Sequence, residues 1–171
     1  MVNGTLGFGA TVTKLTVVSI KDRGASATLT TDDTTYLGVA LEDFDGNLVG
    51  LEQVLVFHAY DVDALVNKAS DATPLTPVDK LDWSSFVYTG LDLSDAIDAL
   101  NGTQLGDLTD SVDVSVDGGV ALNVLNGVLV AKGDFEIALG QVRSAALISG
   151  NGQDADVMTL TLTNVGVFVG V

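Results

Sequence analysis

The chain has 171 residues, a net charge of −16 and a hydrophobic content of 47%, with a mean hydropathy of +0.41. Seven Lys and Arg against 23 Asp and Glu argue against a protein that wraps DNA or RNA, because nucleic-acid affinity comes largely from basic side chains that neutralise phosphates. The absence of cysteine excludes a disulfide scaffold, a thiol nucleophile and a thiolate metal site. This length and apolar content predict one domain, residues 1–171, with a sizeable core.

The acidic charge is carried almost entirely by aspartate, which accounts for 20 of the 23 acids. The apolar content is too high for a disordered acidic chain, so it predicts extensive burial within a subunit and between subunits. Adaptation of the source to salt is an alternative explanation of the aspartate excess. The sequence shows no signal peptide and no apolar run of membrane-spanning length. We therefore expect a soluble protein, or a soluble precursor that assembles, with no membrane partner.

The first third of the chain alternates between extended and turn segments. Apolar residues recur at every second position, the period of a half-buried strand. The pattern predicts an N-terminal arm at residues 1–10, strands at 11–20, 25–31 and 36–41, and turns at 21–24 and 42–47.

Residues 48–65 form the longest mostly apolar stretch, LVGLEQVLVFHAYDVDAL. Its β-branched and aromatic residues favour a core strand. Asp61 and Asp63 are then predicted to form a turn into a short helix that begins near Ala64. His58 is the only histidine, and with no second histidine or cysteine it is predicted to be a packing or edge residue.

The middle of the chain holds the clearest helical segment. A polar loop at residues 70–77 contains both prolines, and a short strand is predicted at 86–88. Residues 92–100 place apolar side chains on one helical face, with Ser94 as a possible cap and an Asn-Gly pair as the stop.

From residue 111 onward the period is two throughout. Residues 112–117, VDVSVD, predict a strand whose polar face carries Asp113 and Asp117. Asn126-Gly127 predicts a tight hairpin between flanking strands. Further strands are predicted at 135–139, 142–148 and 157–169. The whole pattern predicts nine to eleven strands and one or two short flanking helices in a mainly β, antiparallel sandwich or barrel.

No stretch of the sequence carries a recognisable catalytic or metal-binding pattern. Residues 43–47, DFDGN, begin like a calcium loop, but Val54 stands where the twelfth position needs a bidentate Glu. Ser26 lies outside a Gly-x-Ser-x-Gly elbow. Aspartates are so numerous that any carboxylate pair is weak evidence for glycoside chemistry. We expect no enzyme activity, no cofactor and no physiological metal.

Three segments resemble the major tail tube proteins of long-tailed bacteriophages and related archaeal viruses. Residues 24–35, GASATLTTDDTT, are similar to the stretch that leads into the long β-hairpin loop of those proteins. Residues 36–65 are similar to their succession of an aromatic-Leu-Gly segment, an Asp-Gly turn and a strand that ends in aromatic-Asp-x-Asp. Residues 140–171 resemble their closing strands. The likeness covers about half the chain and leaves residues 74–116 unmatched.

The resemblance implies a β-sandwich with a flanking helix that forms hexameric rings, stacked into a hollow tube in the virion tail. The subunit would be made in the host cytoplasm, and its partners would be its own copies and other tail proteins. An acidic lumen would repel DNA phosphates, so viral DNA would pass without specific binding. A long assembly hairpin or loop would lie at about residues 25–47. The candidate interface or lumen residues are Asp32, Asp33, Tyr36, Asp43, Asp45, Asp113 and Asp117.

Three other functions fit the composition. A capsid decoration protein or another virion shell protein would share the fold class but assemble differently. A β-sandwich adhesin or calcium-stabilised binding module would use the acidic turns. An enzyme would have to use His58 or a pair of aspartates.

Overall fold

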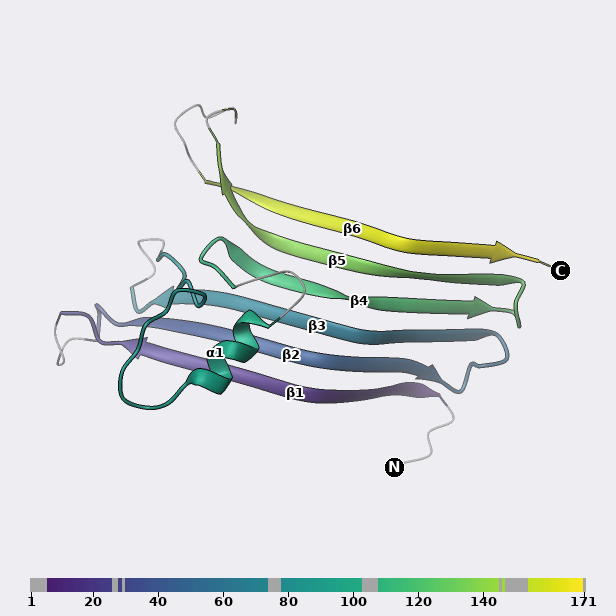
Figure 1. Cartoon of the computed structure of the whole chain (residues 1–171), viewed down its shortest axis with the longest axis horizontal. Helices are drawn as coiled ribbons and strands as arrows, with labels where there is room; N and C mark the ends of the chain where they lie inside the picture. Colours follow the sequence, from purple (N-terminus) through teal and green to yellow (C-terminus); the bar gives the residue numbers. More distant parts are fainter. Residues whose placement is uncertain are drawn as a thin grey trace.

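The computed structural model describes residues 6–25, 28, 30–73, 78–102, 108–144, 146 and 154–170. They form one antiparallel sheet whose six strands follow one another in chain order, together with a single short helix (Figure 1). The elements are β1 (Gly7–Asp22), β2 (Thr34–Val49), β3 (Leu55–Asp71), α1 (Ser94–Asn101), β4 (Val112–Val124), β5 (Leu129–Arg143) and β6 (Asp154–Val169).

The mainly β, antiparallel prediction is confirmed, whereas the sandwich or barrel is not. The sheet is open: its order runs from β1 to β6 without closure, and the described residues contain no second sheet. The predicted number of nine to eleven strands is wrong, because six strands of 13 to 17 residues take their place. Strand β2 runs through the predicted turn at residues 42–47. Strand β3 likewise runs through the predicted turn and helix after residue 60.

Three β-bulges interrupt the strands, and those at Asp43 and Asp61 explain why the two turns were wrongly predicted. Asp43, Asp61 and Asn164 have φ angles of 51°, 50° and 52°, in the left-handed region that Asp and Asn tolerate better than other side chains. The strand pairings shift register beside each of them. A bulge inserts one extra residue, so it reverses which face the following side chains occupy. The strands therefore continue where the period-two pattern breaks.

One face of the sheet is lined by apolar side chains from all six strands. Directly paired residues of neighbouring strands lie side by side on the same face. β4 and β5 pair in regular register between Val114 and Val124, so every second side chain of β4 stays on one face along this length. The rows on either side of the bulges in the other strands therefore lie on the same face of the sheet. We call it the apolar face. Its rows are Leu15, Leu41, Ala64, Val116, Ile137 and Leu160; Val17, Val39, Val66, Val114, Leu139 and Met158; and, beyond the bulges, Phe57, Leu122, Ala131 and Val167.

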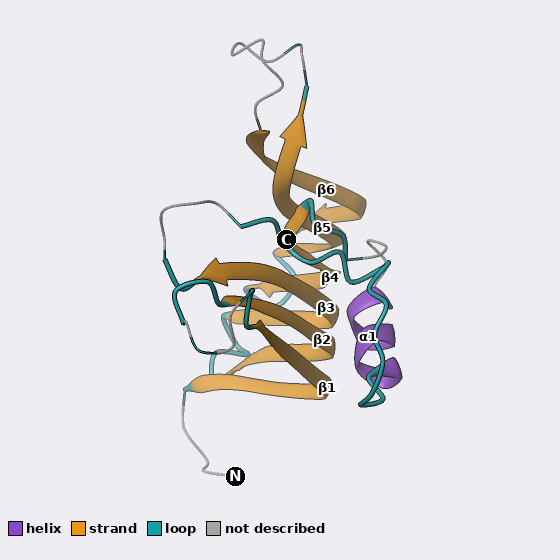
Figure 2. Ribbon diagram, turned by 90° about the vertical axis from the view of Figure 1, so that its left-hand side faces the viewer, coloured by secondary structure: helices purple, strands orange, loops and turns teal. Residues whose placement is uncertain are grey.

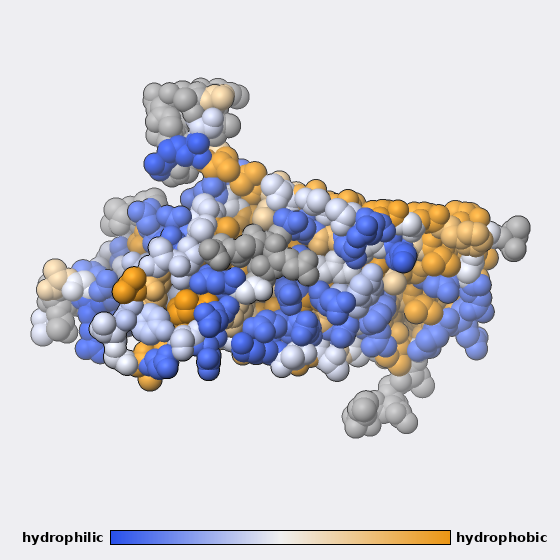
Figure 3. All heavy atoms as spheres, in the orientation of Figure 1, coloured by the Kyte–Doolittle hydropathy of each residue, from blue (hydrophilic) through white to orange (hydrophobic). Residues whose placement is uncertain are grey.

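The opposite face, which we call the helix face, carries α1 and the segment around it. α1 packs against β1 and β2. Figure 2 shows the strands bent, with α1 on the convex side, so the apolar face lies inside the bend. Figure 3 views the helix face and shows hydrophilic residues over α1 and the neighbouring strands, with hydrophobic residues gathered toward β5 and β6. None of the described helical residues forms a helix long and apolar enough to cross a membrane.

The core of the helix face is built around Trp83. Trp83 and Leu100 are fully buried, and Leu65 is nearly so. Gly38 makes room for them, since a Cβ there would lie 2.8 Å from Leu100 Cδ1 and 2.9 Å from the indole of Trp83. Burial of an indole and two leucines provides several kcal/mol of apolar stabilisation, about 1.5–3 kcal/mol for each leucine.

Asn67 supplies the polar contacts of this core. Its side chain is completely buried on β3. Its Oδ1 accepts the Trp83 Nε1–H at 3.0 Å, while its Nδ2 donates to the carbonyl oxygens of Leu81 at 2.8 Å and Thr109 at 2.9 Å. These contacts tie the segment before α1 and the segment after it to the same point on the sheet.

In the second half of the chain, the predicted helix and hairpin are confirmed, whereas the predicted cap and the short strand are not. The helix predicted at residues 92–100 is confirmed as α1, but Ser94 does not cap it: Leu93 is at that position, and the Ser94 N–H donates to Asp92 Oδ1 at 3.0 Å. The strand predicted at residues 86–88 is absent from the described structure. The predicted hairpin is confirmed between β4 and β5, with positive φ at Asn126 and Gly127.

Candidate functional site: the acidic helix face and the sheet edges

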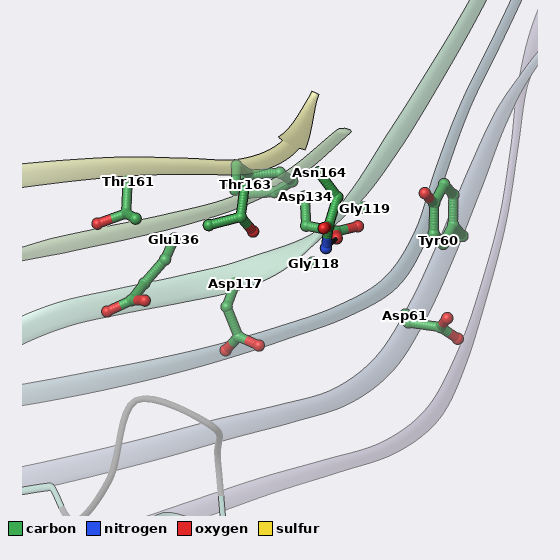
Figure 4. Close-up of a pocket in the computed structure, with 11 residues that line it drawn as sticks. Tyr60, Asp61, Asp117, Gly118, Gly119, Asp134, Glu136, Thr161, Thr163 and Asn164 are labelled. Atoms are coloured by element: carbon green, nitrogen blue, oxygen red, sulfur yellow. Dashed lines mark hydrogen bonds between the residues drawn. The ribbon is translucent and has the colours of Figure 1, made fainter. Parts of the chain in front are cut away.

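Acidic side chains cross the helix face beside α1 in one row. Asp63 on β3 pairs with Asp117 on β4, which pairs with Glu136 on β5. We call these three residues the acidic row. The next row contains Gly119 and Asp134, which line an open cavity of about 380 Å³ together with Asp117 and Glu136 (Figure 4).

Asp117 is the most constrained member of the acidic row. It is only 5% exposed, and its Oδ1 has no hydrogen-bond partner among the described residues. Burial, followed by the negative charges of Asp63 and Glu136, raises the pKa of Asp117 to about 6. Desolvation and like charges both disfavour the carboxylate form. Asp117 therefore changes charge close to neutral pH.

The neighbours of the acidic row hold the backbone in place. Asp63 Oδ1 accepts the Asp43 backbone N–H at 2.8 Å, so the bulges of β2 and β3 are joined by this hydrogen bond. On the other side, a Cβ at Gly119 would overlap the ring of Tyr60. Glycine at this position lets the tyrosine lie against β4.

The remaining predicted site residues lie apart from the acidic row. Asp33 is buried before β2 and pairs with Lys21 at 2.6 Å, and Asp32 precedes it in the same loop. Tyr36 packs against the core at the start of β2. Asp113 lies on β4 and pairs with Lys80 at 2.6 Å.

Asp45 lies in the other half of β2, beyond the bulge. Its carboxylate is 3.6 Å from His58 Nε2, and both side chains are about half exposed. The His58 ring also lies near Tyr60, with ring centroids 5.6 Å apart. Thus the seven predicted residues occupy several places on the sheet and the loop before β2. Only Asp117 belongs to the acidic row, and Asp43 contacts it through Asp63.

Sequence reasoning missed Asp63 and Glu136 as members of this site. Asp63 was assigned to a turn into a helix, and Glu136 carried no motif of its own. The available signal was the alternation of β5, which places Glu136 on a polar face. Pairing it with Asp117 requires the register of two strands, which a single strand pattern does not contain.

The described residues of the acidic row and its surroundings present mainly carboxylates. Among the described residues, no group of three or more His, Asp or Glu side chains has a geometry that could hold a metal ion. His58 contacts a carboxylate and an aromatic ring, with no nucleophilic hydroxyl placed beside it by any described contact. The arrangement can present a patch of negative charge in which the pKa of one member, Asp117, is raised to about 6.

No family model matches the chain, and no curated protein or solved structure matches it either. The geometry of the molecule and the resemblance in its sequence therefore carry the functional argument.

The edges of the sheet form the second part of the candidate site. β1 and β6, each 16 residues long, have a neighbour on one side only. Natural edge strands are usually protected by charges, proline or a covering element. Residues 157–169 of β6 contain no charged residue and no proline. This edge is open to pairing with another strand.

The backbone groups of β6 that point outward can be assigned. Gln141 N–H donates to Ser111 O on the β4 side at 2.9 Å, and Gly170 N–H donates to Val128 O at 3.0 Å. Because successive backbone groups point to opposite sides of a strand, even-numbered residues of β5 face β6. Thr161 pairs with the even-numbered Glu136 and so bonds to β5, whereas Leu160 presents its N–H and C=O to the open edge.

Proposed function

We propose that the chain is a structural subunit that assembles through its sheet edges, and that the assembly is the stacked hexameric ring of a virion tail tube. The observation that carries this proposal is the open six-stranded sheet with two unpaired edges of 16 residues. An isolated protein with such edges would be prone to uncontrolled pairing. Controlled pairing with copies of itself satisfies the same backbone groups.

The topology favours a head-to-tail assembly. An even number of antiparallel strands makes β1 and β6 run in opposite directions. The β1 strand of a neighbouring copy can therefore pair antiparallel with β6 and continue the meander. A contact between two different edges is heterologous. It generates a closed ring when the rotation that relates neighbouring copies adds up to a full turn.

The charge distribution supports a ring whose helix face lines the lumen. Asp117 lies on the helix face of β4, where it pairs with Asp63 and Glu136. Asp113 lies at the register shift near the start of β4 and forms an ion pair with Lys80. A lumen lined by carboxylates repels the phosphates of passing DNA. This arrangement gives the net charge of −16 a function that does not require a specific ligand.

The test blocks the β6 edge without disturbing the β5 ladder. Leu160→Pro removes an N–H that points to the open edge, and proline is tolerated on edge strands in that orientation. Negative-stain microscopy of the full chain should show rings or tubes for the wild type and none for Leu160→Pro. Thr161→Pro is the matched comparison, because it removes an N–H that bonds to β5 and should lower the unfolding temperature.

Two results would contradict the proposal. One is a wild-type protein that forms no ring or tube at any concentration. The other is a Leu160→Pro variant that forms the same rings as the wild type. Trimers or pentamers that bind to a capsid lattice would instead support a decoration protein.

A further inference from the structure

The chain exposes more accessible surface than a compact chain of the same mass, and part of the excess lies on the apolar face. The accessible surface is 11,192 Å². A compact monomer of this mass exposes only about 7,900 Å². Large residues of the apolar face contribute to the difference, because Leu15 is 61% exposed and Met158 is 69% exposed. Edge pairing would cover the backbone of β1 and β6 but leave this face open.

The apolar face is large enough for a stable protein interface. Six strands about 4.8 Å apart and about nine residues long, the length from Val114 to Leu122 on β4, define a face of roughly 850 Å². A typical stable interface buries about 800 Å² per partner. Apolar patches on soluble monomers are usually no larger than a few hundred Å². The area therefore points to a partner that covers the face.

Charge determines which partner fits. Two copies with a net charge of −16 each repel one another, and contact between two acidic helix faces would increase the repulsion. The three rows that define the apolar face contain no charged residue. If two copies meet through their apolar faces, their helix faces point away from each other. The two acidic rows then lie on opposite outer surfaces, separated by both sheets.

We propose that the apolar face packs against the apolar face of a second copy, so that two chains together build a two-layer sandwich. Figure 2 shows that the strands bend toward this face. Bent sheets pack with their strands crossing at near right angles, and bulges form the corners. This contact uses the side chains of the apolar face, whereas edge pairing uses backbone groups of β1 and β6, and it does not rest on the tail tube proposal.

The experiment separates face contacts from edge contacts. Leu160→Pro serves as the background, because it blocks the β6 edge and keeps an apolar residue at that position. Sedimentation equilibrium of this full-length variant should show a dimer. Adding Ile137→Glu, which lies on the apolar face between Val116 and Leu160, should raise the dimer dissociation constant by at least about 100-fold, since a carboxylate would be buried without a partner.

A matched control lies on the same strand and the opposite face. Lys132→Glu also adds a carboxylate to β5, but Lys132 is exposed and pairs across to Ala121 on the helix face. It should leave the dimer in place. Trp83 is the only tryptophan and lies in the core of the helix face, so its fluorescence reports whether each variant remains folded.

A milder variant protects the test against misfolding. If Ile137→Glu unfolds the chain, Leu139→Gln on the neighbouring row should still weaken the dimer while Trp83 stays buried. An edge-blocked protein that remains monomeric at all concentrations would overturn the proposal. A dimer that is insensitive to both variants would also overturn it. Neither result affects the edge test, whose outcome is the presence or absence of rings.

Discussion

The helix face and the apolar face are made by the same strands, yet they differ in what covers them. On the helix face, Trp83 and Leu100 are completely buried under α1 and the segments beside it. On the apolar face, Leu15 and Leu160 remain 61% and 58% exposed although they lie in rows of purely apolar side chains. One face is complete within the chain, and the other has the composition of a core without its second layer.

This difference shows how the chain divides its apolar residues. The stability of a single copy depends on the helix-face core, because that is where side chains leave water on folding. The apolar face contributes little until another surface covers it. Substitutions on the two faces should therefore change different quantities, the unfolding free energy on the helix face and the association constant on the apolar face.

The largest effect on stability is expected from Trp83→Ala. Removal of a fully buried aromatic side chain costs about 3–5 kcal/mol, and Asn67 would also lose its indole donor. Urea unfolding followed by far-UV circular dichroism should show the midpoint moving to lower urea. Val87→Ala is the control, because Val87 is 89% exposed and its substitution should change the midpoint little. Equal effects of the two variants would contradict the assignment of the core.

A smaller effect, with a defined pH dependence, is expected from Asp117→Asn. The pKa of Asp117 is raised to about 6 in the folded chain, above the ordinary value of 3.8. The folded state therefore binds more protons than the unfolded state between these pH values, and wild-type stability falls as pH rises through this window. Above pH 6 the variant should be more stable than the wild type by up to about 3 kcal/mol.

The pH profile gives the control for this prediction. Near pH 3.5 the carboxyl is mostly protonated in both states, so the variant and the wild type should unfold at similar urea concentrations. Glu136→Gln should have a weaker effect in the same direction, because it removes one of the two charges that raise the pKa of Asp117. A variant that is less stable than the wild type at pH 8 would show that the carboxylate has a stabilising partner.

The smallest effect is expected from Asp45→Asn. The Asp45 and His58 side chains are 3.6 Å apart and about half exposed, and an exposed ion pair contributes only about 0–1 kcal/mol. The free energy of unfolding, measured by urea titration, should change by no more than about 1 kcal/mol. His58→Asn should give the same small shift. A large loss in either variant would show that this half of the helix face is covered in the folded state.

Local patterns predicted those parts of the fold that local interactions determine. The alternation of β4, the Asn126-Gly127 hairpin and the helix at α1 follow from residues close in sequence. The continuity of β2 and β3 could not be predicted, because a bulge and a turn have the same Asp-rich composition. The contacts of Asn67 with Leu81, Trp83 and Thr109 join residues up to 42 positions apart, which no periodicity contains.

The candidate site was predictable to a similar extent. The alternation of residues 112–117 placed Asp113 and Asp117 together on one polar face. The charges that raise the pKa of Asp117 come from β3 and β5, so they depend on the pairing of three strands. Openness of the sheet could not be predicted either, since the edge strands carry the same alternation as the central ones.

The pleat gives each strand a two-residue period, and the bulges at Asp43, Asp61 and Asn164 shift that period by one residue in β2, β3 and β6. Deletion of Asp61 would remove the bulge and reverse the faces of the first half of β3. Phe57 would then turn toward the helix face and His58 toward the apolar face. A substitution at the same position would leave the period intact. Insertions and deletions in these strands should therefore be accepted in pairs, while a single one would exchange the helix face and the apolar face for part of its strand.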